Sequence, residues 1–180
     1  SERAGRRKVI GAAERLGITT NLKGHPSVAL GASEVSLLEL TGAYAVLANR
    51  GFPAWPYGIL EIRDGRGKLL YRRSGAGAGR LVQPREVAAL QSMLSDVVTS
   101  GTGRGARLRR PAAGKTGTSQ DFRDAWFIGF TAELVTGVWL GNDNSSPMKK
   151  VTGGSFPARL WKGFMTEALK GAPPRRLRSN

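Results

Sequence analysis

The segment whose residue types could do chemistry is Lys115-Thr116-Gly117-Thr118. The lysine would bring a fixed positive charge, and the two threonine hydroxyls could bind a substrate carboxylate. Gly117 has no side chain, so a substrate could approach the backbone closely, and the amide of the next residue could donate to an oxyanion. This combination suits a site beside a serine nucleophile, although so short a pattern also fits an ordinary solvated strand edge.

Two other patterns imitate nucleotide-binding motifs without their context. Gly114-Lys115-Thr116 matches the end of a phosphate-binding loop, but Arg109 stands where that loop needs glycine. The segment from Gly101 to Ala106 is similar to a dinucleotide fingerprint, but it follows an expected helix instead of a strand. Neither pattern predicts a bound nucleotide.

Few other side chains could act as nucleophile, base or metal ligand. Ser146-Pro147-Met148-Lys149 matches Ser-x-x-Lys, but too few residues separate it from Gly153-Gly154 to form a supporting helix, so we expect a loop. The single histidine, His25, lies in a turn-like segment before proline, which favours a loop role over catalysis. Cysteine is absent, so thiolate metal sites and cysteine nucleophiles are excluded, and we expect neither metal nor cofactor.

The elements that must position Lys115 are three successive apolar strands. In the middle strand, apolar side chains alternate onto both faces, which predicts a sheet covered by helices on both sides. Ser36 and Glu39 form a capping box that predicts the start of a helix. The expected strands are 113–118, 124–131 and 134–140, the helices 3–16, 36–49, 84–99 and 157–170, the hairpin strands 59–63 and 68–71, and a flexible loop 74–79.

The chain is strongly basic, with 28 Lys and Arg against 13 Asp and Glu in 180 residues. A chain of 180 residues is long enough for one domain or for a piece of a larger one. A net charge of +15 favours anionic partners, so a non-catalytic basic module that binds an anionic polymer or a membrane surface is an open alternative. The basic residues are scattered with little aromatic surface between them, which favours a solvated face, and we predict no nucleic acid partner.

Several further segments resemble, in chain order, the penicillin-binding proteins, and within them the bifunctional class A peptidoglycan synthases. The resemblance runs from about residue 3 to residue 170 and includes the Lys-Thr-Gly triplet typical of that family. The similar segments are 27–40, 43–45, 49–51, 101–103, 113–118, 124–130, 138–143 and 152–154.

The resemblance implies an α/β (α+β) fold of the penicillin-binding transpeptidase and serine β-lactamase type, with an antiparallel sheet flanked by helices. It implies D,D-transpeptidation, in which a serine attacks a D-Ala-D-Ala amide and an amine resolves the acyl-enzyme. Lys115 and Gly117 would belong to the third active-site motif, Thr116 and Thr118 would bind the terminal carboxylate, and the Thr118 N–H would serve the oxyanion hole. The implied partners are a peptidoglycan stem peptide and β-lactam antibiotics.

The other two motifs of the family, Ser-x-x-Lys and Ser-x-Asn, do not occur before Lys115. We therefore expect residues 1–171 to be the C-terminal portion of an incomplete transpeptidase domain and 172–180 a basic tail. The nucleophile and a membrane anchor would lie on the missing N-terminal part, placing the protein at the periplasmic or extracytoplasmic face of the membrane. The isolated chain should be inactive, and apolar surface should be exposed where the missing helices belong.

Overall fold

A three-stranded antiparallel sheet forms the centre of the protein. The structure is a computed structural model that describes residues 3–75 and 79–177; residues 76–78 of the expected loop and 178–180 of the expected tail lie outside the described residues. The strands are β3 (Ala113–Thr118), β4 (Asp124–Phe130) and β5 (Val135–Gly141), in the order β3-β4-β5. The strands thus lie within one residue of the segments expected from their apolar pattern.

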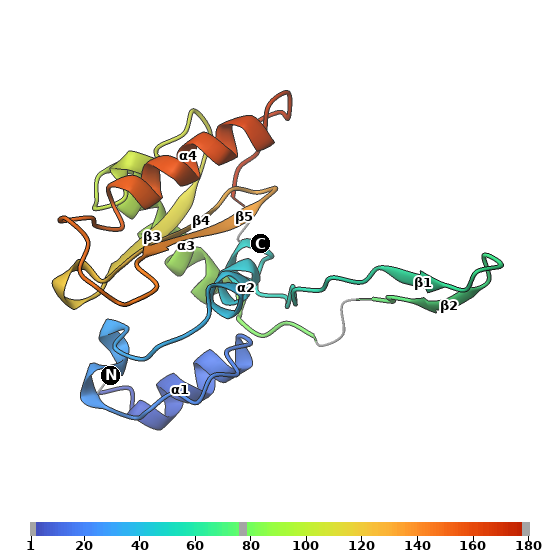
Figure 1. The fold of residues 1–180 in the computed structure, drawn as a ribbon, viewed down its shortest axis with the longest axis horizontal. Coiled ribbons are helices and arrows are strands. Elements are labelled where there is room, and N and C mark those ends of the chain that lie inside the picture. The colour runs from blue at the N-terminus through green and yellow to red at the C-terminus, as the bar shows by residue number, and fades with distance from the viewer. Residues whose placement is uncertain (1–2, 76–78, 178–180) are drawn as a thin grey trace.

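Helices cover both faces of this sheet, as the alternating apolar pattern predicts (Figure 1). Helix α4 (Phe156–Ala168) packs on the face that carries Phe127, whereas α2 (Leu37–Ala48) and α3 (Pro84–Thr99) pack on the face of Phe130. Both phenylalanines are fully buried. The central strand is therefore apolar on both sides because it has no solvent-facing side.

Trp161 is the largest fully buried side chain and joins α4 to the sheet. Its ring meets the Phe127 ring edge-on, with 5.2 Å between ring centroids. Its indole Nε1 donates to the carbonyl oxygens of Gly129 and Thr136 at 3.2 and 3.1 Å. The tryptophan thus fills the core and also satisfies backbone acceptors on two adjacent strands.

Helix α1 (Arg6–Arg15) starts three residues later than its expected range of 3–16. Gly5 has a φ of +82°, which is outside the helical region and so delays the start. Gly17 follows the helix with a φ of +99°, a positive value that glycine adopts readily and that is common just after a helix.

Glu39 ties the segment after α1 to the start of α2. Ser36 and Glu39 form the predicted capping box. The Glu39 carboxylate also accepts hydrogen bonds from the backbone N–H and hydroxyl groups of Thr19 and Thr20. These bonds, led by that of the Thr19 hydroxyl, hold the pKa of Glu39 far below its ordinary value.

We expect Glu39→Gln to loosen this contact. At pH values above 4.5, the ordinary pKa of a glutamate, the unprotonated Glu39 carboxylate stabilises the folded state. This stabilisation is lost as the pH falls through the lower pKa that Glu39 has in the folded protein. Hydrogen-exchange protection of the Thr19 and Thr20 amides should therefore decrease on acidification, and should be low at pH 7 in the variant. Glu34→Gln removes the same charge from a nearby exposed position and should leave this protection unchanged. Equal protection in both variants would contradict this role.

A β-hairpin projects from the body of the protein (Figure 1). It pairs β1 (Glu61–Arg63) with β2 (Leu69–Arg72), and all of these residues are exposed. Strand β1 lies inside the expected segment 59–63, whereas β2 ends one residue beyond the expected segment 68–71. The Glu61 carboxylate pairs with Arg63 and Arg72, whose hydrogen bonds lower the pKa of Glu61. The hairpin is thus an isolated two-stranded arm whose apolar side chains also face solvent.

An apolar groove runs along the outer edge of the sheet, between α2 and β5. Among the described residues, β5 pairs only with β4. The groove is lined in part by Leu38 and Phe164, whose exposed fractions are 65% and 51%. Apolar side chains are therefore exposed along the edge of β5, where a further strand could be added.

The described part of the C-terminal segment is held against the body. Arg110 donates from Nη2 to the carbonyl oxygens of Leu169 and Ala172, and Leu177 packs on the core cluster that includes Phe130. None of the helices in the described residues combines the length and apolar character needed to cross a bilayer.

Candidate active site

Strand β3 presents Lys115, Thr116, Gly117 and Thr118 at the surface. Lys115 and Thr118 are exposed, whereas Thr116 and Gly117 are half-buried, so a ligand can reach all four residues. Thr116 and Thr118 are two residues apart on a strand, which places their hydroxyls on the same face. The position of this face is fixed by pairing with β4, where Thr118 lies opposite Ala125.

The Lys115 side chain folds against its own strand and contacts the backbone of the next residue. Its Nζ donates to the Thr116 carbonyl oxygen at 2.7 Å. This hydrogen bond keeps the positive charge close to the threonines and leaves two of the three ammonium donors for other partners.

Thr102 reaches the site from a different part of the chain. Its Oγ1 lies 2.7 Å from Thr116 Oγ1, a hydrogen bond in which either hydroxyl can donate. Its neighbours fix the loop to the end of α3, because the Gly101 N–H donates to the Asp96 carbonyl and the Gly103 N–H to the Val97 carbonyl. The segment 101–103, one of those that resemble the family, thus contacts strand β3 through Thr102.

The loop before α4 reaches the same site through Gly153 and Gly154. The Gly153 N–H donates to Thr118 Oγ1 at 3.1 Å. A Cβ on Gly153 would lie 2.2 Å from the Trp126 carbonyl oxygen, and one on Gly154 would lie 2.2 Å from that of Thr102. Both positions therefore require glycine, because any side chain would force these backbone segments apart. The paired glycines are visible in the sequence, but their contact with β3 is not.

Residues 142–152 contain neither helix nor strand, as we expect for the segment Ser146-Pro147-Met148-Lys149, which matches Ser-x-x-Lys by sequence. The Asn142 amide Nδ2 donates to the Ser146 Oγ at 3.1 Å and to its carbonyl oxygen at 2.9 Å. No helical turn brings the Lys149 amine over this serine, so the loop lacks the geometry of a Ser-x-x-Lys nucleophile.

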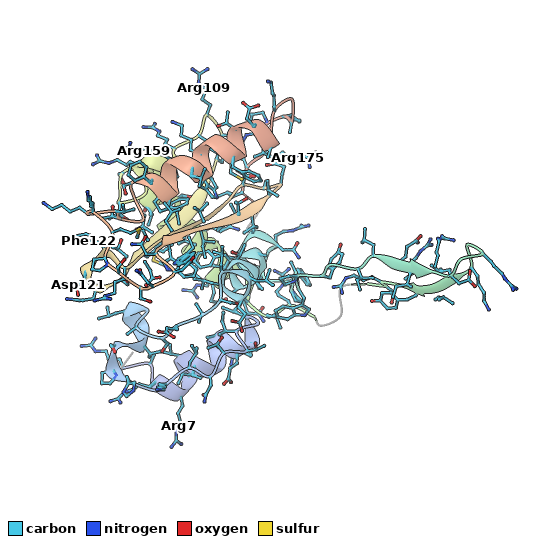
Figure 2. The ribbon with its side chains drawn as sticks, in the orientation of Figure 1. Arg7, Arg109, Asp121, Phe122, Arg159 and Arg175 are labelled. Atoms are coloured by element: carbon cyan, nitrogen blue, oxygen red, sulfur yellow. The ribbon has the colours of Figure 1, made fainter. Side chains whose placement is uncertain are left out.

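The basic side chains of the described residues are not confined to one side of the molecule. Arg7 is exposed on α1, whereas Arg109, Arg159 and Arg175 are exposed around α4, on the opposite side of the molecule (Figure 2). A groove that binds a polyanion needs its positive charges gathered along one path. Three of these arginines lie close to one helix, so the basic-module alternative stays a prediction.

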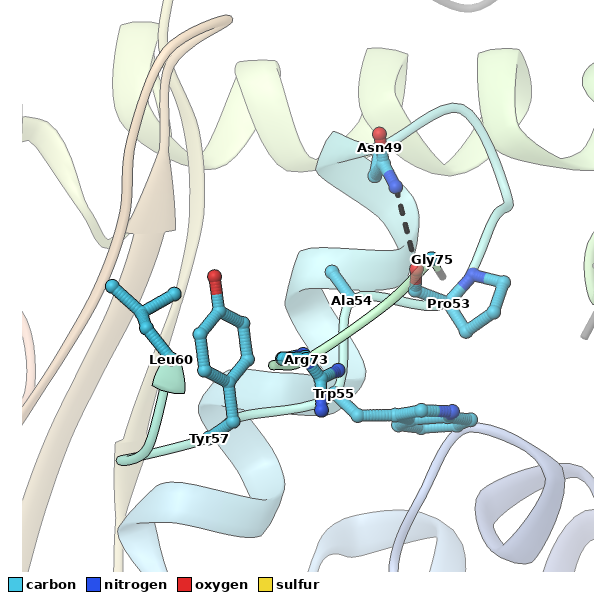
Figure 3. Close-up of a pocket in the computed structure, with 8 residues that line it drawn as sticks. All are labelled: Asn49, Pro53, Ala54, Trp55, Tyr57, Leu60, Arg73 and Gly75. Atoms are coloured by element: carbon cyan, nitrogen blue, oxygen red, sulfur yellow. Dashed lines mark hydrogen bonds between the residues drawn. The ribbon is translucent and has the colours of Figure 1, made fainter. Parts of the chain in front are cut away.

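A pocket at the base of the hairpin is separate from β3 (Figure 3). It is lined by aromatic and aliphatic residues, and the Arg73 guanidinium lies 4.0 Å from the centre of the Tyr57 ring. The Asn49 amide Nδ2 donates to the Pro53 carbonyl and closes one side. These contacts connect the hairpin stem to the end of α2. Within the described ranges, no group of three or more His, Asp or Glu residues could hold a metal ion.

His25 lies before a short 3-10 helix (Pro26–Leu30), in the loop that the sequence predicts. It is exposed and precedes the first proline of that helix.

Comparison with known proteins relates both sequence and fold to one family. Residues 11–152 match the family described as penicillin binding protein transpeptidase domain. Penicillin-binding protein 1A of Neisseria lactamica is 38% identical over 154 residues, which are 82% of this chain but 19% of that protein. The chain thus spans about a fifth of that relative's length.

Two solved structures share this fold. Penicillin-binding protein 1A from Haemophilus influenzae superposes with a TM-score of 0.85 at 27% identity, over 98% of this chain and 33% of that chain. PonA1 from Mycobacterium tuberculosis in complex with penicillin V gives 0.83 at 27% identity, over 97% and 53%. The antiparallel sheet covered by helices is thus the fold of penicillin-binding transpeptidases, and the chain belongs to the penicillin-binding protein transpeptidase domain family, on its class A side.

Proposed function

We propose that this chain forms the carboxylate-binding wall of a D,D-transpeptidase that cross-links peptidoglycan stem peptides. The attacking serine would come from a segment outside residues 1–180, because no Ser-x-x-Lys precedes Lys115. In the completed site the serine attacks the D-Ala-D-Ala amide, D-Ala leaves, and an amine of a neighbouring strand takes the acyl group.

Residues 115–118, called the β3 segment from here on, each have a distinct role in this proposal. The hydroxyls of Thr116 and Thr118 bind the terminal carboxylate of the stem peptide, and the Lys115 ammonium supplies positive charge beside it. The Thr118 N–H donates to the oxyanion that forms when the serine attacks. Gly117 leaves the backbone open to the substrate.

The observation that carries the proposal is the arrangement of one ammonium and two hydroxyls on an accessible strand of a chain from this family. Donors held on a strand need little reorganisation when negative charge arrives, which is what stabilisation of an acyl-transfer transition state requires. The family match over residues 11–152 gives this arrangement its reaction class.

The same wall would bind β-lactam antibiotics, whose carboxylate takes the place of that of D-alanine. The related PonA1 protein was solved in complex with penicillin V. Because peptidoglycan is assembled outside the cytoplasmic membrane, the domain would work at the extracytoplasmic face, anchored through a segment outside this chain.

Labelling with a fluorescent penicillin tests this function. The complete domain, meaning this chain together with the segment encoded before it, should form a covalent adduct that a D-Ala-D-Ala peptide slows. The isolated chain should form none, and Ser146→Ala in the complete domain should label as the unaltered domain does. An adduct on the isolated chain, above all at Ser146, would contradict the proposal, as would a complete domain that never labels.

A further inference from the structure

The two threonine hydroxyls of the β3 segment each contact a backbone or side-chain group from a distant loop. Thr116 Oγ1 lies 2.7 Å from Thr102 Oγ1, and Thr118 Oγ1 accepts from the Gly153 N–H at 3.1 Å. A hydroxyl has one proton to donate and two lone pairs that accept. A carboxylate can only accept, so a threonine that binds it must direct its proton toward the ligand.

At Thr118, the Gly153 N–H determines which way the hydroxyl proton can point. The Gly153 N–H can only donate, so it occupies a lone pair of Thr118 Oγ1 and leaves the hydroxyl proton free. The contact depends on the close approach of Gly153 to β3, which a Cβ would prevent, since it would lie 2.5 Å from the Gly117 carbonyl oxygen.

At Thr116, a bound carboxylate determines which of the two threonine hydroxyls donates to the other. Once Thr116 donates its proton to a carboxylate, the 2.7 Å contact requires Thr102 to be the donor to Thr116. The result is a chain of two hydroxyls that point the same way, in which each bond polarises the next. Hydrogen bonds from Gly101 and Gly103 to the end of α3 hold Thr102 in place.

We infer that Thr102 is a positioning residue of this site, and that it and the Gly153 amide orient the Thr116 and Thr118 hydroxyl protons toward the substrate carboxylate. The inference rests on the proposed function, because it assumes that this carboxylate binds to the β3 segment. Thr102 does not touch the substrate itself; it acts through Thr116. The similar segments 101–103 and 152–154 thereby acquire a shared role.

The test compares acylation rates of complete-domain variants with a fluorescent penicillin and with its carboxyl methyl ester. Thr102→Val keeps the shape but lacks the hydroxyl, and should lower the second-order rate with the free acid about 3- to 10-fold, as expected for one hydrogen bond. Thr102→Ser keeps the hydroxyl and should stay within about 2-fold of the unaltered domain. With the ester, the unaltered domain and Thr102→Val should react at equal rates.

The possible outcomes separate the inference from the proposed function. Equal rates for Thr102→Val and the unaltered domain with the free acid would overturn the inference alone. An equal loss of acylation rate in Thr102→Val with the free acid and with the ester would also overturn the inference, because it would show that Thr102 has a merely structural role. Thr102→Ala also lacks the hydroxyl and provides the same comparison if the valine variant does not fold. Failure of the unaltered domain to react with any penicillin would overturn both.

Discussion

Lys115→Met in the complete domain is expected to lower the rate of acylation by penicillin about 10²- to 10³-fold, the range for loss of one preorganised charge-stabilising donor. Methionine has a similar length but no charge, so strand β3 should keep its pairing with β4. What is lost is the ammonium that Thr116 holds through its carbonyl oxygen, 2.7 Å from Nζ. Stopped-flow fluorescence with a labelled penicillin measures this rate.

Lys149→Met is the matched control for this prediction. It removes the same charge from an exposed loop outside β3 and changes the lysine of the segment that matches Ser-x-x-Lys, Ser146-Pro147-Met148-Lys149. The control should react within about 2-fold of the unaltered domain, as is usual for surface substitutions. Comparable losses in the two variants would show that overall charge, and not the position of Lys115, accounts for the effect.

Trp161→Ala should destabilise the protein by about 3–5 kcal/mol, the usual cost of truncating a large buried aromatic residue. The indole is fully buried, contacts Phe127, and satisfies the carbonyls of Gly129 and Thr136. Small domains have a total stability of about 5–15 kcal/mol, so this change should leave the chain close to unfolding. Urea unfolding followed by tryptophan fluorescence or circular dichroism measures it.

Leu160→Ala is the control on the same helix. Leu160 is 55% exposed, so its truncation should change the free energy of unfolding by about 0.5 kcal/mol or less. If both substitutions cost the same, α4 does not pack on the sheet through Trp161 as described.

The helices and strands of this fold were predictable where they are marked by residues close together in the sequence. The capping box of Ser36 and Glu39 marks the start of α2, and Pro84 marks the start of α3. Alternating apolar residues define β4 as a strand covered on both faces. Such signals depend on neighbours within one or two turns of the chain, so the sequence contains them directly.

Contacts between distant segments were not predictable in this way. The bonds of Glu39 to Thr19 and Thr20 link groups about 20 residues apart. The contact of Thr102 with Thr116 joins residues 14 apart, and that of Gly153 with Thr118 spans 35. The spacing of apolar residues along the sequence does not predict such contacts, because they depend on how α3 and the loop before α4 pack on the sheet.

The candidate site shows the same division. Lys115, Thr116, Gly117 and Thr118 were identified from residue type and spacing, and the structure places them on an accessible strand. The groups that surround their hydroxyls became visible only in three dimensions. Glycines in the segments 101–103 and 152–154 were the one available signal, since closely packed backbones require them.

A crystal structure of the complete domain acylated by a penicillin tests the central claim most directly. The account predicts the carboxylate of the bound drug within hydrogen-bonding distance of the hydroxyls of both Thr116 and Thr118, with the acyl group on a serine that precedes residue 1. A carboxylate bound elsewhere, or an acyl group on a serine of residues 1–180, would contradict it.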